Sequence, residues 1–355
     1  MSALIHFLSK FFFGADRKKT VIPANPASCL IIRQHNQLGD MLATVPLFRA
    51  IKSKFPGIKL YVLASPDNFF ALNKNCYVDR LFVFDKKKLF DFKYLKEFFG
   101  FLRLGYDITL VPGTVSISFT SCLLAGISSA KLKVGPAKLN GKKNEADYFF
   151  HIPVDLDWSK NPRQSVYRFI LEVLEPFNVP ESDIHGEVTF DSDDSGEAER
   201  FIEQNNLSRK YLVGLHVGAG KPPNVWNAGG FSSLINKLQE DLDVPVFLTG
   251  SNQDDIQIEQ VQNGLKIRVP VYKNKSITSL AAMISKADLF ISNDTGIMHV
   301  AGATQVPQIS LFGPTDPDNW AAPGGNKINL RKSENIDDIT VDEVYNTAVK
   351  ILLKN

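Results

Sequence analysis

The sequence contains little cysteine and no large excess of charge of either sign. Only three cysteines occur in 355 residues, Cys29, Cys76 and Cys122, and none forms a C-x-x-C pair. This usage excludes a disulfide scaffold and a zinc knuckle and is typical of a reducing cytoplasm. Forty basic and 38 acidic residues leave a formal charge of +2. A chain so close to neutral has no bulk electrostatic attraction to nucleic acid.

A transmembrane helix needs about 20 consecutive apolar residues. We expect no such helix from this sequence. Residues 108–130 carry no charge, but eight Ser and Thr residues together with Pro112 and Gly113 favour a buried strand and a small-residue helix. The apolar residues 3–13 lack a basic leader and a cleavage site, so no signal peptide is expected. They are typical of an amphipathic helix on an anionic membrane surface. They equally fit a frayed extension that packs its phenylalanines on the body.

Several catalytic and metal-binding motifs are also missing. No G-x-S-x-G elbow is present, which argues against a serine hydrolase. The acidic pairs at 155–157 and 241–243 have D-x-D spacing, but they lie among turn residues without a histidine partner. Solvated turns explain them better, and we expect no metal ion and no cofactor.

Apolar runs alternate with periodic, helix-like segments along the chain. Strands are predicted at 29–33, 59–63, 80–84, 108–111, 131–134, 211–216, 244–248, 289–292 and 308–312. Helices are predicted at 41–54, 86–104, 116–126, 165–176, 231–241, 254–264, 277–286, 296–303 and 341–353. This alternation predicts an α/β fold with parallel sheets covered on both faces, arranged as two doubly wound, Rossmann-like domains that face each other across a cleft.

A polar, turn-rich stretch at 178–208 separates the two strand series. We therefore expect an N-terminal extension (1–27), two Rossmann-like domains and a C-terminal helix. The predicted bounds of the last three parts are 28–180, 181–335 and 336–355.

The first strand-to-helix turn carries Asn36, Gly39 and Asp40. Gly39 allows a substrate to approach the backbone closely. Asp40 is a candidate general base for an acceptor hydroxyl. Because aspartate is also preferred at helix N-termini, the spacing alone favours a capping role.

A glycine-rich turn at 214–226 contains Gly220 and Lys221, which suggest phosphate binding by backbone N–H groups and one cation. It is not a Walker A loop, because Gly214 is one residue too far away and Pro222 replaces the Ser or Thr. A solvated lysine in a glycine-rich turn is the alternative.

The segment 292–299 joins an apolar strand to a small-residue helix and contains Asp294, Thr295, Gly296 and His299. Backbone N–H groups at such a turn lie at the positive end of a helix dipole and attract anions. A helix cap and a buried core histidine are the alternatives. Together with Gly220 and Lys221, the segment favours a diphosphate site.

At these three turns the sequence resembles glycosyltransferase family 9, the bacterial heptosyltransferases of lipopolysaccharide core synthesis. Residues 38–46 match its G-D-x-x-x-x-x-P pattern, and 279–284 leading to 292–301 resembles its most diagnostic stretch. Residues 311–315 continue that pattern, and 249–251 with Asp254 resembles a further turn of the second domain.

The resemblance implies a GT-B fold, with the acceptor bound by the first domain and the nucleotide-sugar by the second. It implies inverting, metal-independent transfer, typically of heptose from ADP-heptose, to a lipid-linked saccharide at the cytoplasmic face of the inner membrane. Asp40 is then the base, with Asn36 and Gly39 on the acceptor side. The donor-binding residues implied are Gly220, Lys221, Asn224, Asp254, Asp294, Thr295, Gly296 and His299.

One position departs from the family pattern. The family's lysine two residues before the tryptophan matched by Trp226 is replaced by Asn224, and the nearest lysine is Lys221. Either Lys221 reaches the donor phosphates or donor binding is altered. The alternatives are transfer of a hexose or N-acetylhexosamine from another nucleotide, and a degenerate protein that binds nucleotide or glycan without turnover. Intact Asp40, Asp294 and His299 favour turnover.

Overall fold

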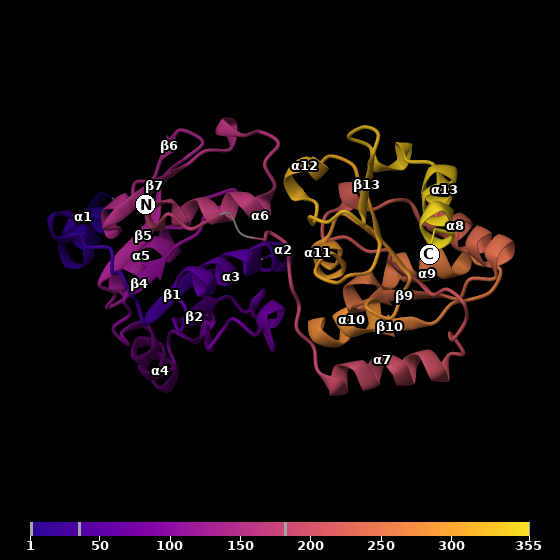
Figure 1. Ribbon diagram of the computed structural model, residues 1–355, viewed down its shortest axis with the longest axis horizontal. Helices are drawn as coiled ribbons and strands as arrows, with labels where there is room; N and C mark the ends of the chain where they lie inside the picture. Colours follow the sequence, from indigo (N-terminus) through magenta and orange to yellow (C-terminus); the bar gives the residue numbers. More distant parts are fainter. Residues whose placement is uncertain (1–2, 35–36, 181–182, 355) are drawn as a thin grey trace. The chain divides into compact units, whose positions relative to one another are not determined.

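The computed structural model describes residues 3–34, 37–180 and 183–354. The chain divides into two compact units, Met1–Ile184 and His185–Asn355. Each unit contains one predominantly parallel β-sheet flanked by helices (Figure 1). The predicted α/β class with two doubly wound sheets is confirmed.

In unit 1 the strand order is β3-β2-β1-β4-β5, with β7 parallel to β5 and β6 antiparallel to it. The strands are β1 (Ser28–Arg33), β2 (Lys59–Ala64), β3 (Arg80–Val83), β4 (Ile108–Leu110), β5 (Leu132–Leu139), β6 (Lys142–Lys143) and β7 (Ile152–Leu156). β7 was not predicted, because its sequence Ile-Pro-Val-Asp-Leu contains a proline and the acidic residue of a supposed turn. At the edge of the sheet both residues are tolerated.

The α-helices of unit 1 are α1 (Ala3–Phe13), α2 (Leu38–Leu42), α3 (Val45–Lys54), α4 (Phe92–Leu102), α5 (Phe119–Ile127) and α6 (Val166–Phe169). Its 3₁₀ helices are η1 (Arg17–Lys19), η2 (Phe69–Leu72), η3 (Lys86–Lys88), η4 (Asp147–Phe149), η5 (Trp158–Lys160) and η6 (Ile170–Phe177).

Two predicted helices of unit 1 are in fact divided. The segment 41–54 is interrupted before α3, where Pro46 lies in the first turn. Proline is favoured there and cannot continue a preceding helix. The segment 86–104 is interrupted by Asp91, whose carboxylate accepts hydrogen bonds from the N–H groups of Lys93 and Tyr94. This cap fixes the start of α4.

The N-terminal helix α1 packs on unit 1 through one side only. His6 and Ser9 lie within hydrogen-bond distance of the Tyr148 hydroxyl, at 3.2 and 2.7 Å. Phe11 and Phe12 are 76% and 66% exposed. The helix is thus anchored to the body while part of its aromatic surface faces solvent. Among the described residues, no helix has both the length and the apolar character needed to cross a membrane.

Unit 2 contains a six-stranded sheet in the order β10-β9-β8-β11-β12-β13, all parallel. The strands are β8 (Val213–His216), β9 (Val246–Gly250), β10 (Val271–Lys273), β11 (Leu289–Asn293), β12 (Gln308–Phe312) and β13 (Lys327–Arg331). The two edge strands, β10 and β13, were not predicted, because both are only partly buried and β10 has only three residues.

The α-helices of unit 2 are α7 (Ser192–Gln204), α8 (Ala228–Leu242), α9 (Asp255–Asn263), α10 (Ile277–Ile284), α11 (Gly296–Gly302), α12 (Pro317–Trp320) and α13 (Val341–Leu352). Its 3₁₀ helices are η7 (Pro222–Asn224), η8 (Asn252–Asp254) and η9 (Ile336–Asp338). The final helix α13 buries Val344, Ala348 and Leu352 in the core of this unit.

The interpretation of 178–208 as turn-rich throughout was wrong. Asp191 and Asp194 form a reciprocal capping box that starts the 13-residue helix α7. Aspartates that looked like turn residues are therefore helix-start residues. The acidic pair at 241–243 likewise lies at the end of α8, where Asp243 adopts the left-handed conformation that ends the helix.

In each sheet the chain reverses its direction of strand addition beside the first strand. The reversal falls between β1 and β4 in unit 1 and between β8 and β11 in unit 2. Ligands of open parallel sheets bind in the crevice at the carboxyl ends of the strands at such a point. The loops that follow these four strands are therefore the places where functional side chains are expected.

One stability prediction concerns Lys133 in β5, which is buried and donates to the Gly126 carbonyl at 2.6 Å. Burial lowers its pKa from 10.5 to about 8. Between pH 8 and pH 10.5, Lys133 is protonated to a greater extent in the unfolded chain than in the folded chain. Its contribution to the free energy of unfolding therefore rises with pH across this window and is lowest below pH 8. We expect the stability of the wild type relative to Lys133→Met to increase by about 2 kcal/mol from pH 8 to 10.5.

Chemical denaturation of both proteins at several pH values measures this difference. The exposed Lys350 provides a control, since Lys350→Met should show no comparable pH dependence. A difference between wild type and Lys133→Met that stays constant over the window would contradict the prediction.

Candidate active site

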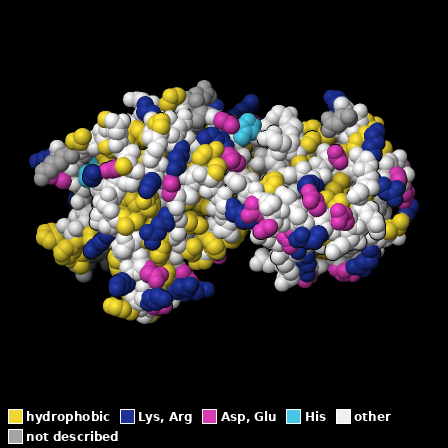
Figure 2. Space-filling view, turned by 60° about the horizontal axis from the view of Figure 1, so that its bottom comes forward, with side chains coloured by type: hydrophobic (Ala, Val, Ile, Leu, Met, Phe, Trp, Pro, Cys, Tyr) yellow, Lys and Arg dark blue, Asp and Glu magenta, His cyan; other side chains and the backbone are white. Residues whose placement is uncertain are grey.

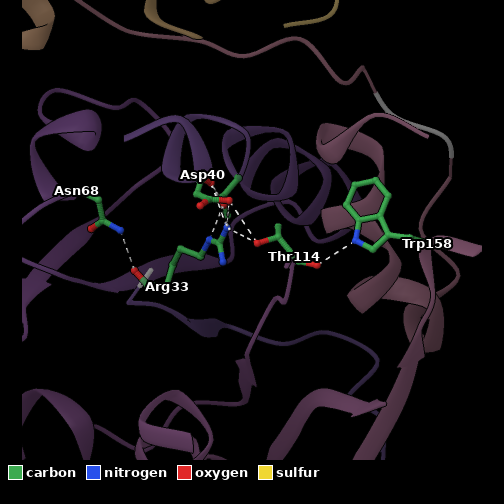
Figure 3. A network of polar contacts seen from close by, with 6 residues as sticks. Arg33, Asp40, Asn68, Thr114 and Trp158 are labelled. Carbon is green, nitrogen blue, oxygen red and sulfur yellow. Dashed lines mark hydrogen bonds and ion pairs between the residues drawn. The ribbon is translucent and has the colours of Figure 1, made fainter. Parts of the chain in front are cut away.

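The centre of the candidate site in unit 1 is a buried ion pair between Arg33 and Asp40 (Figure 3). Arg33 ends β1, and Asp40 lies in the first turn of α2. Arg33 Nη2 donates to Asp40 Oδ1 at 3.0 Å, and the two side chains are only 3% and 5% exposed. Asp40 is not the N-cap of α2, which is Gln37. Its carboxylate instead faces the end of β1.

Two threonines hold this pair in place. Thr44 Oγ1 donates to the Asp40 carbonyl at 2.7 Å and accepts from Arg33 Nε at 3.2 Å. Thr114, which follows β4, donates to Asp40 Oδ1 at 3.3 Å. The carboxylate is therefore fixed by groups from both strands that flank the reversal point of the sheet.

A second layer of contacts supports these residues. Asn68 donates to the Arg33 carbonyl at 3.3 Å, and Trp158 Nε1 donates to the Thr114 carbonyl at 3.0 Å (Figure 3). The Trp158 ring stacks on Phe169 with ring centroids 4.0 Å apart. These contacts tie the site to β2 and to the segment after β7, so its geometry is set before any ligand binds.

The electrostatics of the pair are those of a compensated buried charge. Burial lowers the pKa of Arg33, and the charge of Asp40 acts in the opposite direction. An isolated charge would be costly at this depth, whereas the paired charges remain compatible with the fold. Asp40 is thus a preorganised carboxylate that can accept a proton from a bound hydroxyl.

A pocket adjoins the ion pair at the carboxyl ends of β1, β4 and β5. Its volume is about 320 Å³ including the open mouth, and Arg33 forms part of its wall. Hydroxyl and amide groups that line it come from Gln34, Ser116, Ser118 and Ser121. The pocket offers several hydrogen-bonding groups next to Arg33, as a polyhydroxyl ligand requires.

In unit 2 the two loops at the reversal point are joined by Asn224 and Asp294. Asn224 Nδ2 donates to Asp294 Oδ2 at 2.9 Å and to the Asp294 carbonyl at 3.3 Å. Asn224 is 8% exposed. This asparagine therefore orients Asp294.

The neighbouring Asn293 joins the same loops by further hydrogen bonds. Its amide donates to the carbonyls of Val217 and Gly218 at 3.0 and 3.2 Å, and its oxygen accepts from the Trp226 N–H at 3.1 Å. Trp226 is buried and donates from Nε1 to the Ile339 carbonyl. The loop after β8 is consequently fixed at both ends.

The ionisation of Asp294 responds to its surroundings. Burial raises its pKa, while a hydrogen bond from Thr315 and the charge of Lys221 act to lower it. Lys221 itself is exposed. Lys221, whose charge acts on Asp294, therefore remains accessible to an anionic ligand.

The other predicted donor-side residues differ in their positions. Thr295 is the N-cap of α11 and Gly296 its first residue. The Met298 N–H donates to the Thr295 carbonyl at 3.0 Å, whereas the N–H groups of Gly296 and Ile297 have no acceptor within the helix. His299 is 8% exposed on the same helix. Gly220 lies exposed in the loop after β8.

Asp254 stabilises the conformation of the loop after β9. Its Oδ2 accepts from the N–H and hydroxyl of Ser251 at 2.7 and 2.9 Å. A Cβ atom at Gly218 would lie 2.0 Å from Asp254 Oδ1, so only glycine fits at that position. Asp254 thereby sets the path of the loop that carries Lys221.

On the acceptor side, Gly39 is buried in α2 and Asn36 lies outside the described residues. Sequence reasoning missed Arg33, Thr114 and Thr315 as members of the two sites. Arg33 carried a usable signal, because a lone arginine at the end of an apolar strand requires a buried anion. Nothing in the sequence singled out Thr114, whereas Thr315 ends the stretch 311–315 that resembles the family pattern. Within the described ranges, no three His, Cys, Asp or Glu side chains are grouped as metal ligands.

The chain is similar to several known proteins in sequence and in structure. The Escherichia coli lipopolysaccharide heptosyltransferase 3 is 24% identical over 306 residues, which are 82% of this chain and 85% of that protein. The glycosyl transferase family 9 structure from Veillonella parvula has a TM-score of 0.80 at 18% identity, covering 95% of this chain and all of that one. The E. coli ADP-heptose lps heptosyltransferase II has a TM-score of 0.75 at 19% identity, with coverages of 92% and 99%.

Both structural likenesses show the GT-B fold. Residues 106–344 match the family described as glycosyltransferase family 9 (heptosyltransferase). The chain therefore belongs to glycosyltransferase family 9 and is a glycosyltransferase.

Proposed function

We propose that this enzyme transfers heptose from ADP-heptose to a hydroxyl of a lipopolysaccharide core saccharide or a related lipid-linked saccharide. The transfer inverts the anomeric centre and needs no metal ion. The names of the similar E. coli proteins support the donor and the acceptor class. The observation that carries the proposal is the buried, doubly supported carboxylate of Asp40 at the reversal point of the first sheet.

In the proposed reaction Asp40 takes the proton of the acceptor hydroxyl. The hydroxyl oxygen attacks the anomeric carbon as the bond from that carbon to the diphosphate oxygen breaks, and the electron pair leaves with ADP. A single displacement of this kind inverts configuration. Arg33 keeps the carboxylate in place, and the pocket lined by Ser116 and Ser118 receives the acceptor together with Gly39 and Asn36.

Unit 2 supplies the donor side in this proposal. Lys221 and the N–H groups at Gly220, Thr295 and Gly296 bind the diphosphate and stabilise the charge that develops as ADP leaves. Lys221 thus takes over from the family lysine replaced by Asn224, which instead positions Asp294. Asp294 and His299 then contact the sugar, and Asp254 shapes the loop.

We place the enzyme in the cytoplasm, in peripheral contact with the inner membrane through α1. The exposed Phe7, Phe11 and Phe12 on one side of this helix, with Lys10 between them, support such a contact. A lipid-linked acceptor requires the enzyme to work at that surface. Nucleic acid is not expected as a partner.

The function is tested by incubating the purified chain with ADP-heptose and a core saccharide acceptor, with and without EDTA. We expect equal rates in both conditions and, by NMR, a product whose anomeric configuration is opposite to that of the donor. Parallel reactions with UDP- and GDP-hexoses and UDP-N-acetylhexosamine serve as the donor comparison. Turnover with only one of those donors, loss of activity in EDTA, or retained configuration would contradict the corresponding part of the proposal.

A second prediction concerns the base itself. Asp40→Asn keeps an oxygen that accepts from Arg33 but removes the proton acceptor, so we expect kcat to fall by about 1000-fold. The matched control is Asp79→Asn, which changes a half-exposed carboxylate of the same unit and should leave kcat unaltered.

Since the buried guanidinium loses its countercharge in Asp40→Asn, the melting temperature of the variant must be recorded alongside its rate. The assignment is refuted if a folded Asp40→Asn protein retains more than about one tenth of the wild-type rate.

A further inference from the structure

A segment of unit 1 that the proposed reaction does not use exposes several large apolar side chains. Phe90, between η3 and α4, is 100% exposed, and Phe92 at the start of α4 is 83% exposed. Phe99 and Leu104 follow with 41% and 49%. Single exposed apolar residues are ordinary, but such a group within one short segment marks a contact surface.

These side chains do not belong to the core-facing side of α4. That side buries Phe98, Phe101 and Leu102. Phe92 and Phe99 are seven residues apart, so they lie on one face of the helix, and Lys96 and Arg103 fall on the same face. The outward face of α4 is therefore both aromatic and basic rather than simply polar.

The charges around these aromatic residues have one dominant sign. Between residues 85 and 104 there are six basic residues and three acidic ones. The carboxylates of Asp85 and Asp91 are occupied by backbone N–H groups at the starts of η3 and α4. We define the α4 surface as Phe90, Phe92, Phe99 and Leu104 with Lys86, Lys87, Lys88, Lys93, Lys96 and Arg103.

Three lysines elsewhere in this unit are paired with acidic side chains. Lys52, Lys131 and Lys138 form ion pairs with aspartates at 2.6, 2.7 and 3.1 Å. In contrast, none of the five lysines of the α4 surface has an acidic partner among residues that the structure describes. Their ammonium groups are exposed and available to anions outside the chain.

We propose that the α4 surface docks on an anionic lipid bilayer. Its phenylalanines enter the interface between headgroups and acyl chains, and its lysines contact lipid phosphates. Interspersed basic and aromatic side chains match such a surface in charge and polarity. Figure 2, in which the lower side of Figure 1 comes forward, shows yellow and dark blue side chains next to one another at the end of unit 1 where α4 lies.

The location of the α4 surface is compatible with the contact proposed for α1. Phe13 of α1 and Phe98 of α4 pack against the same core cluster, which also includes Leu124 of α5. Both helices thus contact one core cluster of unit 1. Two attachment points restrain the orientation of this unit on a membrane more strongly than one amphipathic helix does.

The inference rests on the proposed function only for the lipid-linked nature of the acceptor, and its test requires no transfer. The full chain is floated with vesicles of phosphatidylcholine alone and with vesicles that contain about 30% phosphatidylglycerol. We expect binding to the anionic vesicles, weakened at least tenfold in Phe90→Ser/Phe92→Ser and in Lys86→Gln/Lys87→Gln/Lys88→Gln.

The matched control is Ile256→Ser/Ile267→Ser, which removes two apolar side chains of unit 2 that are each 70% exposed. It should bind vesicles as the wild type does. Wild-type binding in both α4-surface variants, equal binding to neutral vesicles, or no vesicle binding by the wild type would overturn the inference. The last result would point to a protein partner instead.

Transfer to a delipidated acceptor separates this inference from the proposed function. The phenylalanine and lysine variants should keep the wild-type rate with that acceptor. The substituted residues lie far from Arg33 and Asp40 in the sequence and do not contact this ion pair. If the wild type transfers no sugar to this acceptor, the proposed function is refuted, whereas the result of the vesicle-binding experiment is unaffected.

Discussion

The buried ion pair between Arg33 and Asp40 is the constraint on which the proposed chemistry depends. A carboxylate at this depth is tolerated because a guanidinium compensates its charge and the Thr114 hydroxyl donates a hydrogen bond to it. The pair joins the end of β1 to α2, and Thr114 adds the loop after β4. The fold of unit 1 thereby presents one fixed carboxylate beside a polar pocket.

Unit 2 uses the same topology for a different purpose. Its reversal point carries two asparagines that join the loops after β8 and β11 by side-chain hydrogen bonds. These bonds orient Asp294 and leave Lys221 exposed. The two sheets are alike in strand order, so the proposed difference between a proton acceptor and an anion site would arise from a few side chains at equivalent positions.

The sequence predicted the class of fold and the turns that carry the sites, because buried parallel strands have strong apolar patterns and polar turns interrupt them. It failed where local signals are ambiguous. The aspartates at 191 and 194 looked like turn residues until their capping geometry was known. Arg33 and Asn224 show the other limit. The position of Arg33 indicated a buried anion but not which one, and the partner of Asn224 lies 70 residues away in the chain.

The central claim is that ADP binds to unit 2 through Lys221, whereas Asp40 of unit 1 acts only on the acceptor. Calorimetric titration of ADP into the wild type, Lys221→Met and Asp40→Asn tests this division directly. The account predicts that Lys221→Met raises the Kd for ADP about tenfold or more, the loss expected for one charge-assisted contact, and that Asp40→Asn leaves it within about twofold. An unchanged Kd in Lys221→Met, or loss of ADP binding in a folded Asp40→Asn protein, would contradict it.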